Sequence, residues 1–242
     1  MAGADEGAVR TRRFRVFRFR RGDAAPRMDA FDVPIEAAGT VLEGLRWIKI
    51  HADPGLAIRH SCFHASCGTC GVRVDGREAL ACVTALDPSA EGVTVEPMAN
   101  LPVLADLVVD MGPFFGRFTE PHPLVRPAEP SGGDPNGDRP NGGDPEHERF
   151  EDCIECGLCL SACPVAATDD TYVGPAALAY AQRMLERGEG DRGGILDWAD
   201  GPGGAWRCHA AFECTEACPS GVRPAQRIMA LRRELVRPRG GP

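Results

Sequence analysis

One stretch decides the fold of this chain: Cys153-Ile-Glu-Cys156-Gly-Leu-Cys159-Leu-Ser-Ala-Cys163-Pro164. Its spacing, C-x2-C-x2-C-x3-C-P, is one that holds an iron–sulfur cluster. Three thiolates at intervals of three residues can surround one face of a cubane cluster. The fourth cysteine of such a run normally binds a second cluster. The stretch therefore predicts a partner motif elsewhere in the chain.

The partner motif lies at residues 208–219, Cys208-His-Ala-Ala211-Phe-Glu-Cys214-Thr-Glu-Ala-Cys218-Pro219. In register with the first run, its second position is alanine, Ala211, where a cysteine would stand. If each run gives its last cysteine to the other cluster, one site has four thiolates and is expected to hold [4Fe–4S]: Cys153, Cys156, Cys159 and Cys218. The other site has three. A cubane that lacks one protein ligand is expected to lose that iron, which predicts a [3Fe–4S] cluster on Cys163, Cys208 and Cys214.

A third cysteine group precedes both runs. It is spaced C-x4-C-x2-C with a distant fourth member, which is the plant-type [2Fe–2S] pattern: Cys62, Cys67, Cys70 and Cys82. A hairpin with an Asp75-Gly76 turn is expected to bring Cys82 back to the loop. His60 and His64 flank the ligands, and a Rieske centre would use two histidines in place of two cysteines. Because four cysteines already have the required spacing, we interpret both histidines as loop residues.

The total of eleven cysteines needs a chemical explanation. Disulfides are rare in reducing compartments, and an odd total fits paired bridges poorly. Zinc is the competing metal, because zinc ribbons also use C-x2-C pairs, but such sites need pairs of pairs with four ligands each. Iron–sulfur spacings account for every cysteine in groups of four, four and three.

Composition limits the class of protein. With 242 residues the chain is long enough for one or two domains, and it is 43% hydrophobic and 26% charged. Its net charge of −8 argues against a nucleic-acid partner. No run of about 18 apolar residues suggests a transmembrane helix, and no signal peptide is recognisable, so the protein is expected to stay in the cytoplasm.

The N-terminal half is predicted to be a β-grasp, the plant-type ferredoxin architecture. Residues 11–21 alternate apolar and basic side chains, with Phe14 and Val16 inward and a bulge or twist at Val16-Phe17. A second strand is expected at 31–35, at a sheet edge because of its Pro34. A capping box at Thr40 predicts a helix, and a closing strand is expected at 93–97. Residues 101–115 are predicted to form a short helix that leads out of the domain.

Domain limits follow from composition. The fold class is α+β, with a β-grasp [2Fe–2S] domain at 9–125 and an all-α, bacterial-ferredoxin-like domain with the other two clusters at 149–242. Residues 126–148 are rich in Pro, Gly and Asp and are predicted to be a disordered linker. Helices are expected at 174–187 and 222–236, with apolar stripes that form core faces.

The order of these motifs resembles the iron–sulfur subunits of succinate dehydrogenase and fumarate reductase. Matching segments are Arg59-His-Ser-Cys62, Leu80-Ala-Cys82-Val-Thr, Leu101-Pro-Val, Asp106-Leu-Val-Val-Asp-Met111, Gly174-Pro-Ala-Ala and Arg207-Cys208-His209. The resemblance implies an electron relay without a catalytic residue in this chain. Electrons would pass from the FAD of a flavoprotein subunit through [2Fe–2S], [4Fe–4S] and [3Fe–4S] to a quinone. A membrane-anchor subunit of the cytochrome b type would hold the chain peripherally on the cytoplasmic face of the membrane. The assembled complex would act in the tricarboxylic acid cycle and in respiration.

Three residues bear on the quinone site that the resemblance implies. Pro164 and His209 match positions near the quinone site, and His209 is equally well interpreted as a hydrogen-bonding neighbour of the cluster. Thr168 stands where ubiquinone-reducing members carry a tryptophan, which favours menaquinone. Alternatives are a menaquinol-dependent fumarate reductase, in which the relay runs backwards, and a zinc-stabilised interaction module.

Overall fold

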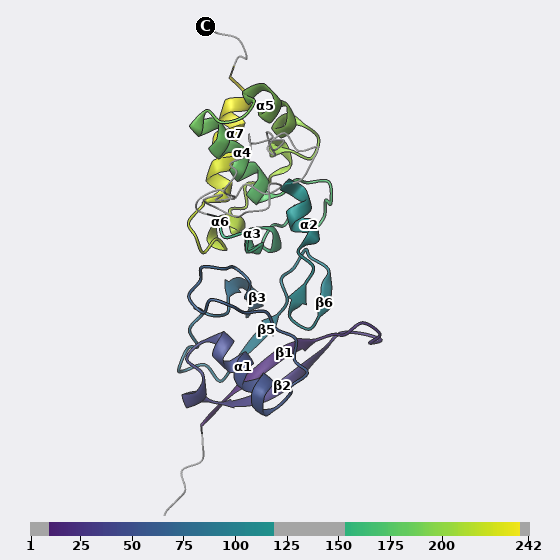
Figure 1. The fold of residues 1–242 in the computed structure, drawn as a ribbon, viewed down its shortest axis with the longest axis vertical. Coiled ribbons are helices and arrows are strands. Elements are labelled where there is room, and N and C mark those ends of the chain that lie inside the picture. The colour runs from purple at the N-terminus through teal and green to yellow at the C-terminus, as the bar shows by residue number, and fades with distance from the viewer. Residues whose placement is uncertain (1–9, 119–152, 238–242) are drawn as a thin grey trace, which may run out of the picture. The chain divides into compact units, whose positions relative to one another are not determined.

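The computed structural model describes residues 10–118 and 153–237, which form two compact units (Figure 1). The first unit comprises residues up to Met98 together with Pro102–Asp110, and the second comprises Ala99–Leu101 and the residues from Met111 onward. The first contains the sheet and the second is helical, as the predicted α+β class requires. The domain boundaries expected at 125/126 and 148/149, and the linker between them, lie outside the described residues.

The first unit is built on a five-stranded sheet with the order β2-β1-β5-β3-β4. β1 and β5 pair in parallel, and the other neighbours are antiparallel. Pro34 ends β2, which is an edge strand as predicted. Asp75 and Gly76 join β3 to β4 with φ values of 49° and 81°, as a tight hairpin turn requires. The strand bounds are Thr11–Arg18 (β1), Arg27–Pro34 (β2), Gly71–Val74 (β3), Arg77–Leu80 (β4) and Gly92–Glu96 (β5).

One helix, α1 (Val41–His51), packs on this sheet and completes the predicted β-grasp. The capping box is present: Thr40 Oγ1 accepts the Glu43 N–H at 3.3 Å, and Glu43 Oε2 accepts the Thr40 N–H at 2.9 Å. Gly44 lets the helix approach closely, because a Cβ at this position would lie 2.1 Å from Cζ of the fully buried Phe14. A short 3₁₀ turn, η1 (Ile35–Ala37), leads from β2 toward α1.

The bulge expected at Val16-Phe17 is wrong. Phe14 and Val16 are buried as predicted, but the β1–β2 register runs unbroken from Thr11↔Pro34 to Arg18↔Arg27. The alternation therefore continues, and Arg18 points inward with only 3% of its surface exposed. An arginine can occupy this inner position because carboxylates surround it.

The helix expected over 101–115 is also largely wrong. This segment forms a small hairpin of β6 (Val103–Ala105) and β7 (Val108–Val109), followed only by the short α2 (Gly112–Phe115) and η2 (Gly116–Phe118). Asp106 sits in the hairpin turn with φ 45°. Its buried carboxylate accepts hydrogen bonds from Phe19 N at 3.0 Å and Ala57 N at 2.8 Å. These tertiary partners override the apolar spacing that suggested a helix.

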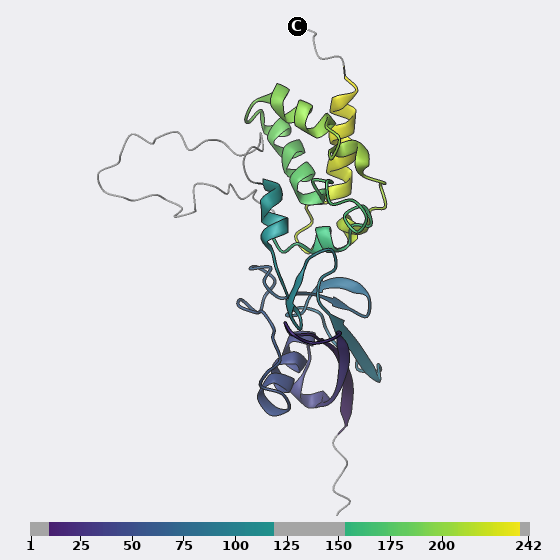
Figure 2. The same cartoon turned by 90° about the vertical axis from the view of Figure 1, so that its right-hand side faces the viewer.

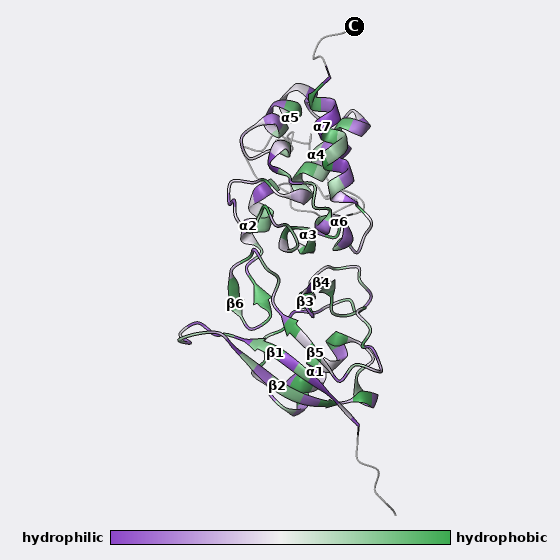
Figure 3. Cartoon of the chain, turned by 180° about the vertical axis from the view of Figure 1, so that it is seen from behind, coloured by the Kyte–Doolittle hydropathy of each residue, from purple (hydrophilic) through white to green (hydrophobic). Residues whose placement is uncertain are grey.

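The second unit is helical. α4 and α7 lie side by side, which Figures 1 and 2 both show, and they confirm the predicted helices. The ribbons of α4 and α7 both carry hydrophobic and hydrophilic residues, as the colours of Figure 3 show. Among the described residues no helix is long and apolar enough to span a membrane. The bounds are Leu158–Ser161 (α3), Pro175–Arg187 (α4), Arg192–Asp200 (α5), Ala205–Arg207 (η3), Glu213–Glu216 (α6) and Pro224–Leu235 (α7).

Candidate metal centres

All eleven cysteines are free thiols, and the structure gathers them into three groups. The first group lies in the loop before β3 and just after β4. The Cys62 thiol interacts with Cys67, and the Cys70 thiol interacts with both Cys67 and Cys82. The cysteines predicted to bind [2Fe–2S] are therefore neighbours in space.

The backbone of this first loop turns N–H groups toward sulfur. Phe63, Ala65 and Gly68 all have positive φ, at 64°, 60° and 70°. The N–H groups of His64 and Ser66 donate to Cys62 Sγ at 3.5 and 3.3 Å. Successive amides that face one point form a concavity that suits an anion.

The pKa values of Cys62 and Cys70 in this loop are shifted in opposite directions. The hydrogen bond from the His64 N–H, with help from Cys67 and Ser66, lowers the pKa of Cys62 to about 6. Burial raises the pKa of Cys70 to about 12. The rings of both flanking histidines are exposed: His64 Nδ1 contacts the Cys62 carbonyl oxygen, and His60 lies against Phe63.

The two cysteine runs of the second unit share one backbone conformation. Glu155 and Ala210 both have a φ of 55°, and each run then places a left-handed residue, Gly157 (79°) or Phe212 (65°), directly before a short helix. The helices that follow are α3 and α6. Glycine suits this left-handed position in the first run, where a Cβ at position 157 would also lie 2.9 Å from Cε at the flexible end of Met111.

In both cysteine runs, the sulfur of the first cysteine accepts a hydrogen bond from the backbone N–H two residues later. Cys153 Sγ accepts the Glu155 N–H at 3.4 Å, and Cys208 Sγ accepts the Ala210 N–H at 3.4 Å. The two runs therefore correspond position for position. Ala211 occupies the place in the second run that Cys156 occupies in the first.

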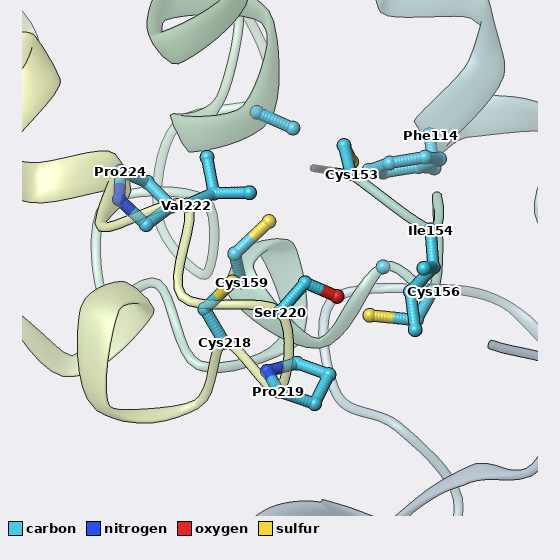
Figure 4. A pocket seen from close by; sticks show the side chains of 12 residues that line it. Phe114, Cys153, Ile154, Cys156, Cys159, Cys218, Pro219, Ser220, Val222 and Pro224 are labelled. Atoms are coloured by element: carbon cyan, nitrogen blue, oxygen red, sulfur yellow. The ribbon is translucent and has the colours of Figure 1, made fainter. Parts of the chain in front are cut away.

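The second group of cysteines lines a single pocket (Figure 4). The Cys156 and Cys159 sulfurs point into it from opposite sides. The pocket also includes apolar side chains such as Phe114 and Val222. Its four cysteines are Cys153, Cys156, Cys159 and Cys218, the set predicted for [4Fe–4S].

Burial disfavours the thiolate form of three of these cysteines, Cys153, Cys156 and Cys159. It raises the pKa of Cys153 to about 12 and that of Cys156 to about 11, and it raises the pKa of Cys159 well above its ordinary value. A metal ligand must be a thiolate, so iron binding would displace these protons. Four sulfur donors in an apolar pocket fit the chemistry of an iron–sulfur cluster.

The third group consists of Cys163, Cys208 and Cys214. Cys163 interacts with Cys208, and Cys214 interacts with both. Burial raises the pKa of Cys163 and brings that of Cys214 to about 12. Ala211 itself is exposed and supplies no ligand. Three sulfur donors with a vacant fourth position fit a three-iron cluster.

The residues expected near a quinone lie at the surface. Pro164, Thr168 and His209 are all exposed, and the first and last adjoin Cys163 and Cys208 in the chain. The Thr168 hydroxyl donates to the Val165 carbonyl at 3.3 Å.

No three His, Cys, Asp or Glu side chains in residues 10–118 and 153–237 are placed to hold one shared metal ion. In [4Fe–4S] and [3Fe–4S] clusters each thiolate binds a different iron, and in [2Fe–2S] the four thiolates are shared between two irons, so the ligands of one cluster lie further apart than those of a single metal ion.

Two supporting residues were missed by the sequence analysis. Asn100, in the left-handed region with φ 59°, donates its side-chain amide to the carbonyls of Leu160, Ser161 and Cys163. Arg232 on α7 donates to the carbonyls of Ala205 and Cys208. Neither residue lies in a cysteine motif, and only the tolerance of asparagine for positive φ offered a signal.

The comparisons with known proteins cover both units. Residues 13–116 match the model of a 2Fe–2S iron–sulfur cluster binding domain, and residues 149–222 match that of a 4Fe–4S dicluster domain. The fumarate reductase iron–sulfur subunit of Mycobacterium tuberculosis is 42% identical over 212 residues, which are 85% of each chain. The succinate dehydrogenase iron–sulfur subunit of Paracoccus denitrificans is 32% identical over 235 residues, which are 96% of this chain and 90% of the relative.

A solved structure has the same fold. A chain of the Mycobacterium smegmatis Sdh1 complex in the apo form superimposes with a TM-score of 0.75 at 24% identity, and the match covers 94% of this chain and 96% of that one.

Proposed function

The chain belongs to the iron–sulfur subunits of the succinate dehydrogenase and fumarate reductase family, and from this premise we propose that it relays electrons through three clusters to a quinone. It is an electron-transfer subunit of an oxidoreductase. The electrons would come from the FAD of a flavoprotein subunit. When bound, the clusters supply one-electron carriers whose potentials depend on cluster type, charge and hydrogen bonds to sulfur.

We assign the ligands from the three cysteine groups. [2Fe–2S] would be held by Cys62, Cys67, Cys70 and Cys82; [4Fe–4S] by Cys153, Cys156, Cys159 and Cys218; and [3Fe–4S] by Cys163, Cys208 and Cys214. The support is that each set is a spatial neighbourhood of free thiols. Beyond binding, the protein contributes backbone N–H groups to sulfur and apolar walls that exclude water.

One observation carries the three-iron assignment. The backbone of the two runs repeats position for position, and Ala211 falls where Cys156 supplies a thiol in the first run. A cluster with this vacancy would be the terminus of the relay, next to the acceptor.

The exposed residues around this last group support a quinone site and a docking surface for a membrane-anchor subunit. Pro164 and His209 would border the quinone. Trp206, with 49% of its surface exposed, lies two residues before Cys208 and would face the anchor. The chain would then sit peripherally on the cytoplasmic face of the membrane.

We propose succinate oxidation as the physiological direction. The reverse reaction, reduction of fumarate by menaquinol, is a second candidate because a fumarate reductase subunit is among the similar relatives and because Thr168 favours menaquinone.

The test is anaerobic purification of the complex that contains this chain. We expect iron and sulfide for three clusters, an oxidised-state three-iron electron paramagnetic resonance (EPR) signal, and partial reduction by succinate. A colourless chain that contains zinc would overturn the proposal. Parallel assays of succinate with a menaquinone analogue, and of fumarate with the reduced analogue, decide the direction.

A further inference from the structure

Tyr172 has a buried hydroxyl that nothing in the cluster assignment uses. The residue lies in the core of the helical unit with 1% of its surface exposed. Its hydroxyl oxygen has no hydrogen-bond partner among residues 10–118 and 153–237. A buried hydroxyl without a partner is unfavourable, so its presence needs a reason.

The surroundings of this hydroxyl supply the reason. Cys163 belongs to the same buried core cluster as Tyr172, and Cys208 packs against that cluster. The hydroxyl interacts with the three thiols assigned to the last cluster, first Cys208 and then Cys163 and Cys214. The Cys208 thiol is close enough to interact with it but does not reach complete hydrogen-bond geometry.

The backbone of Tyr172 is fixed from two sides. Its carbonyl accepts the Arg117 Nε–H at 3.4 Å, and its N–H donates to the Asp169 carbonyl at 3.4 Å. The ring is enclosed by core residues. The hydroxyl is therefore held beside the three sulfurs and does not swing freely.

The chemistry of the hydroxyl suits a donor. A tyrosine O–H donates one hydrogen bond. Thiolate sulfur is the acceptor that the site would offer once iron replaces the thiol protons.

We propose that the Tyr172 hydroxyl donates a hydrogen bond to the Cys208 sulfur in the loaded protein and thereby raises the reduction potential of the three-iron cluster. The proposal rests on the ligand assignment of the proposed function. A hydrogen bond to cluster sulfur favours the more negative, reduced state, and such bonds are one of the protein's means of setting the potential. Tyr172 would be a positioning and tuning residue, not a ligand.

The test uses Tyr172→Phe in the complete complex, with Tyr180→Phe as the matched control. Tyr180 is the other tyrosine of the chain, is buried in the same core, and has its own interactions. A redox titration followed by the three-iron EPR signal measures the potential. We expect Tyr172→Phe to lower the reduction potential of the three-iron cluster. The decrease should correspond to a three- to tenfold change in the one-electron equilibrium constant, where a tenfold change equals 59 mV. Tyr180→Phe should leave it unchanged.

A second measurement does not depend on a variant. The oxidised three-iron cluster is paramagnetic, so pulsed electron–nuclear double resonance of the unsubstituted complex in H2O and D2O should show an exchangeable proton coupled to it, which Tyr172→Phe removes. An unchanged potential together with an unchanged proton signal in Tyr172→Phe would overturn the inference and leave the cluster assignment intact. Absence of any three-iron signal from the unsubstituted complex would overturn the assignment and the inference together.

Discussion

The side-chain amide of Asn100 lies 3.0 Å from the carbonyl oxygen of Cys163 and donates a hydrogen bond to it. The same nitrogen donates to the carbonyls of Leu160 and Ser161 at 2.9 Å, and Ala99 N donates to Ser161 Oγ at 2.8 Å. The last carbonyls of a helix have no partner within it. A segment distant in sequence therefore caps α3, which ends two residues before the cysteine assigned to the last cluster.

Replacing Asn100 should loosen this cap. Asn100→Gly keeps the positive φ but removes the donors, and leaving buried carbonyls unpaired costs about 1–3 kcal/mol. Asn100→Ala should lose about a further 1 kcal/mol because alanine disfavours the left-handed region. Thermal unfolding monitored by cluster absorbance should give midpoints in the order parent, glycine variant, alanine variant. A glycine variant as stable as the parent would show that the three hydrogen bonds contribute nothing.

The difference between what was and was not predictable has a physical cause. Cysteine spacing is dictated by ligand geometry, so the three groups could be recognised from the sequence. The β-grasp elements were also predictable, because each depends on local signals such as the Thr40 capping box. Arg18, Asp106 and Asn100 were not, because each depends on partners far away in the chain. Tyr172 lies in none of the sequence motifs, and only the burial of its hydroxyl in the structure distinguishes it from other core residues.

The crossed ligation of the two helical clusters can be tested by a pair of serine variants. Cys218 belongs by sequence to the second run but lines the pocket of the first. Cys218→Ser should therefore disturb the [4Fe–4S] cluster, and Cys163→Ser the [3Fe–4S] cluster. EPR of the reduced and oxidised complexes distinguishes the two clusters, and each variant is the control for the other. The opposite pattern of losses would mean that each run binds its own cluster.

Ala211 is the position that decides the cluster type. Ala211→Cys restores a thiol at the place equivalent to Cys156, so the three-iron site should become a second [4Fe–4S] with a lower potential. Iron content should rise by one atom per chain, and the oxidised three-iron signal should disappear. Ala211→Ser introduces a similar side chain without sulfur and should retain three irons. A cysteine variant with an unchanged three-iron signal would refute the assignment of this position.

In the first unit, Arg18 should be a main determinant of stability. Its Nε donates to Asp106 Oδ1 at 3.1 Å, and its side chain also pairs with Asp29 and Asp53. The Arg18 and Asp106 side chains are only 4% and 1% exposed. Removing one partner of a buried pair leaves an uncompensated charge, which costs about 3–5 kcal/mol. Arg18→Met should destabilise the unit by about this amount in urea unfolding followed by [2Fe–2S] absorbance.

Arg27→Met is the matched control for this prediction. Arg27 also pairs with Asp29, at 3.0 Å, but its side chain is 55% exposed. Pairs between exposed side chains contribute about 0–1 kcal/mol, since water already solvates both charges. The two arginines therefore share a carboxylate partner and differ in burial. Equal losses in the two variants would mean that the shared Asp29, not the buried Asp106, accounts for the contribution of Arg18. A much larger loss for Arg18→Met would show that the carboxylates that Arg18 does not share with Arg27, those of Asp53 and Asp106, anchor the end of β1.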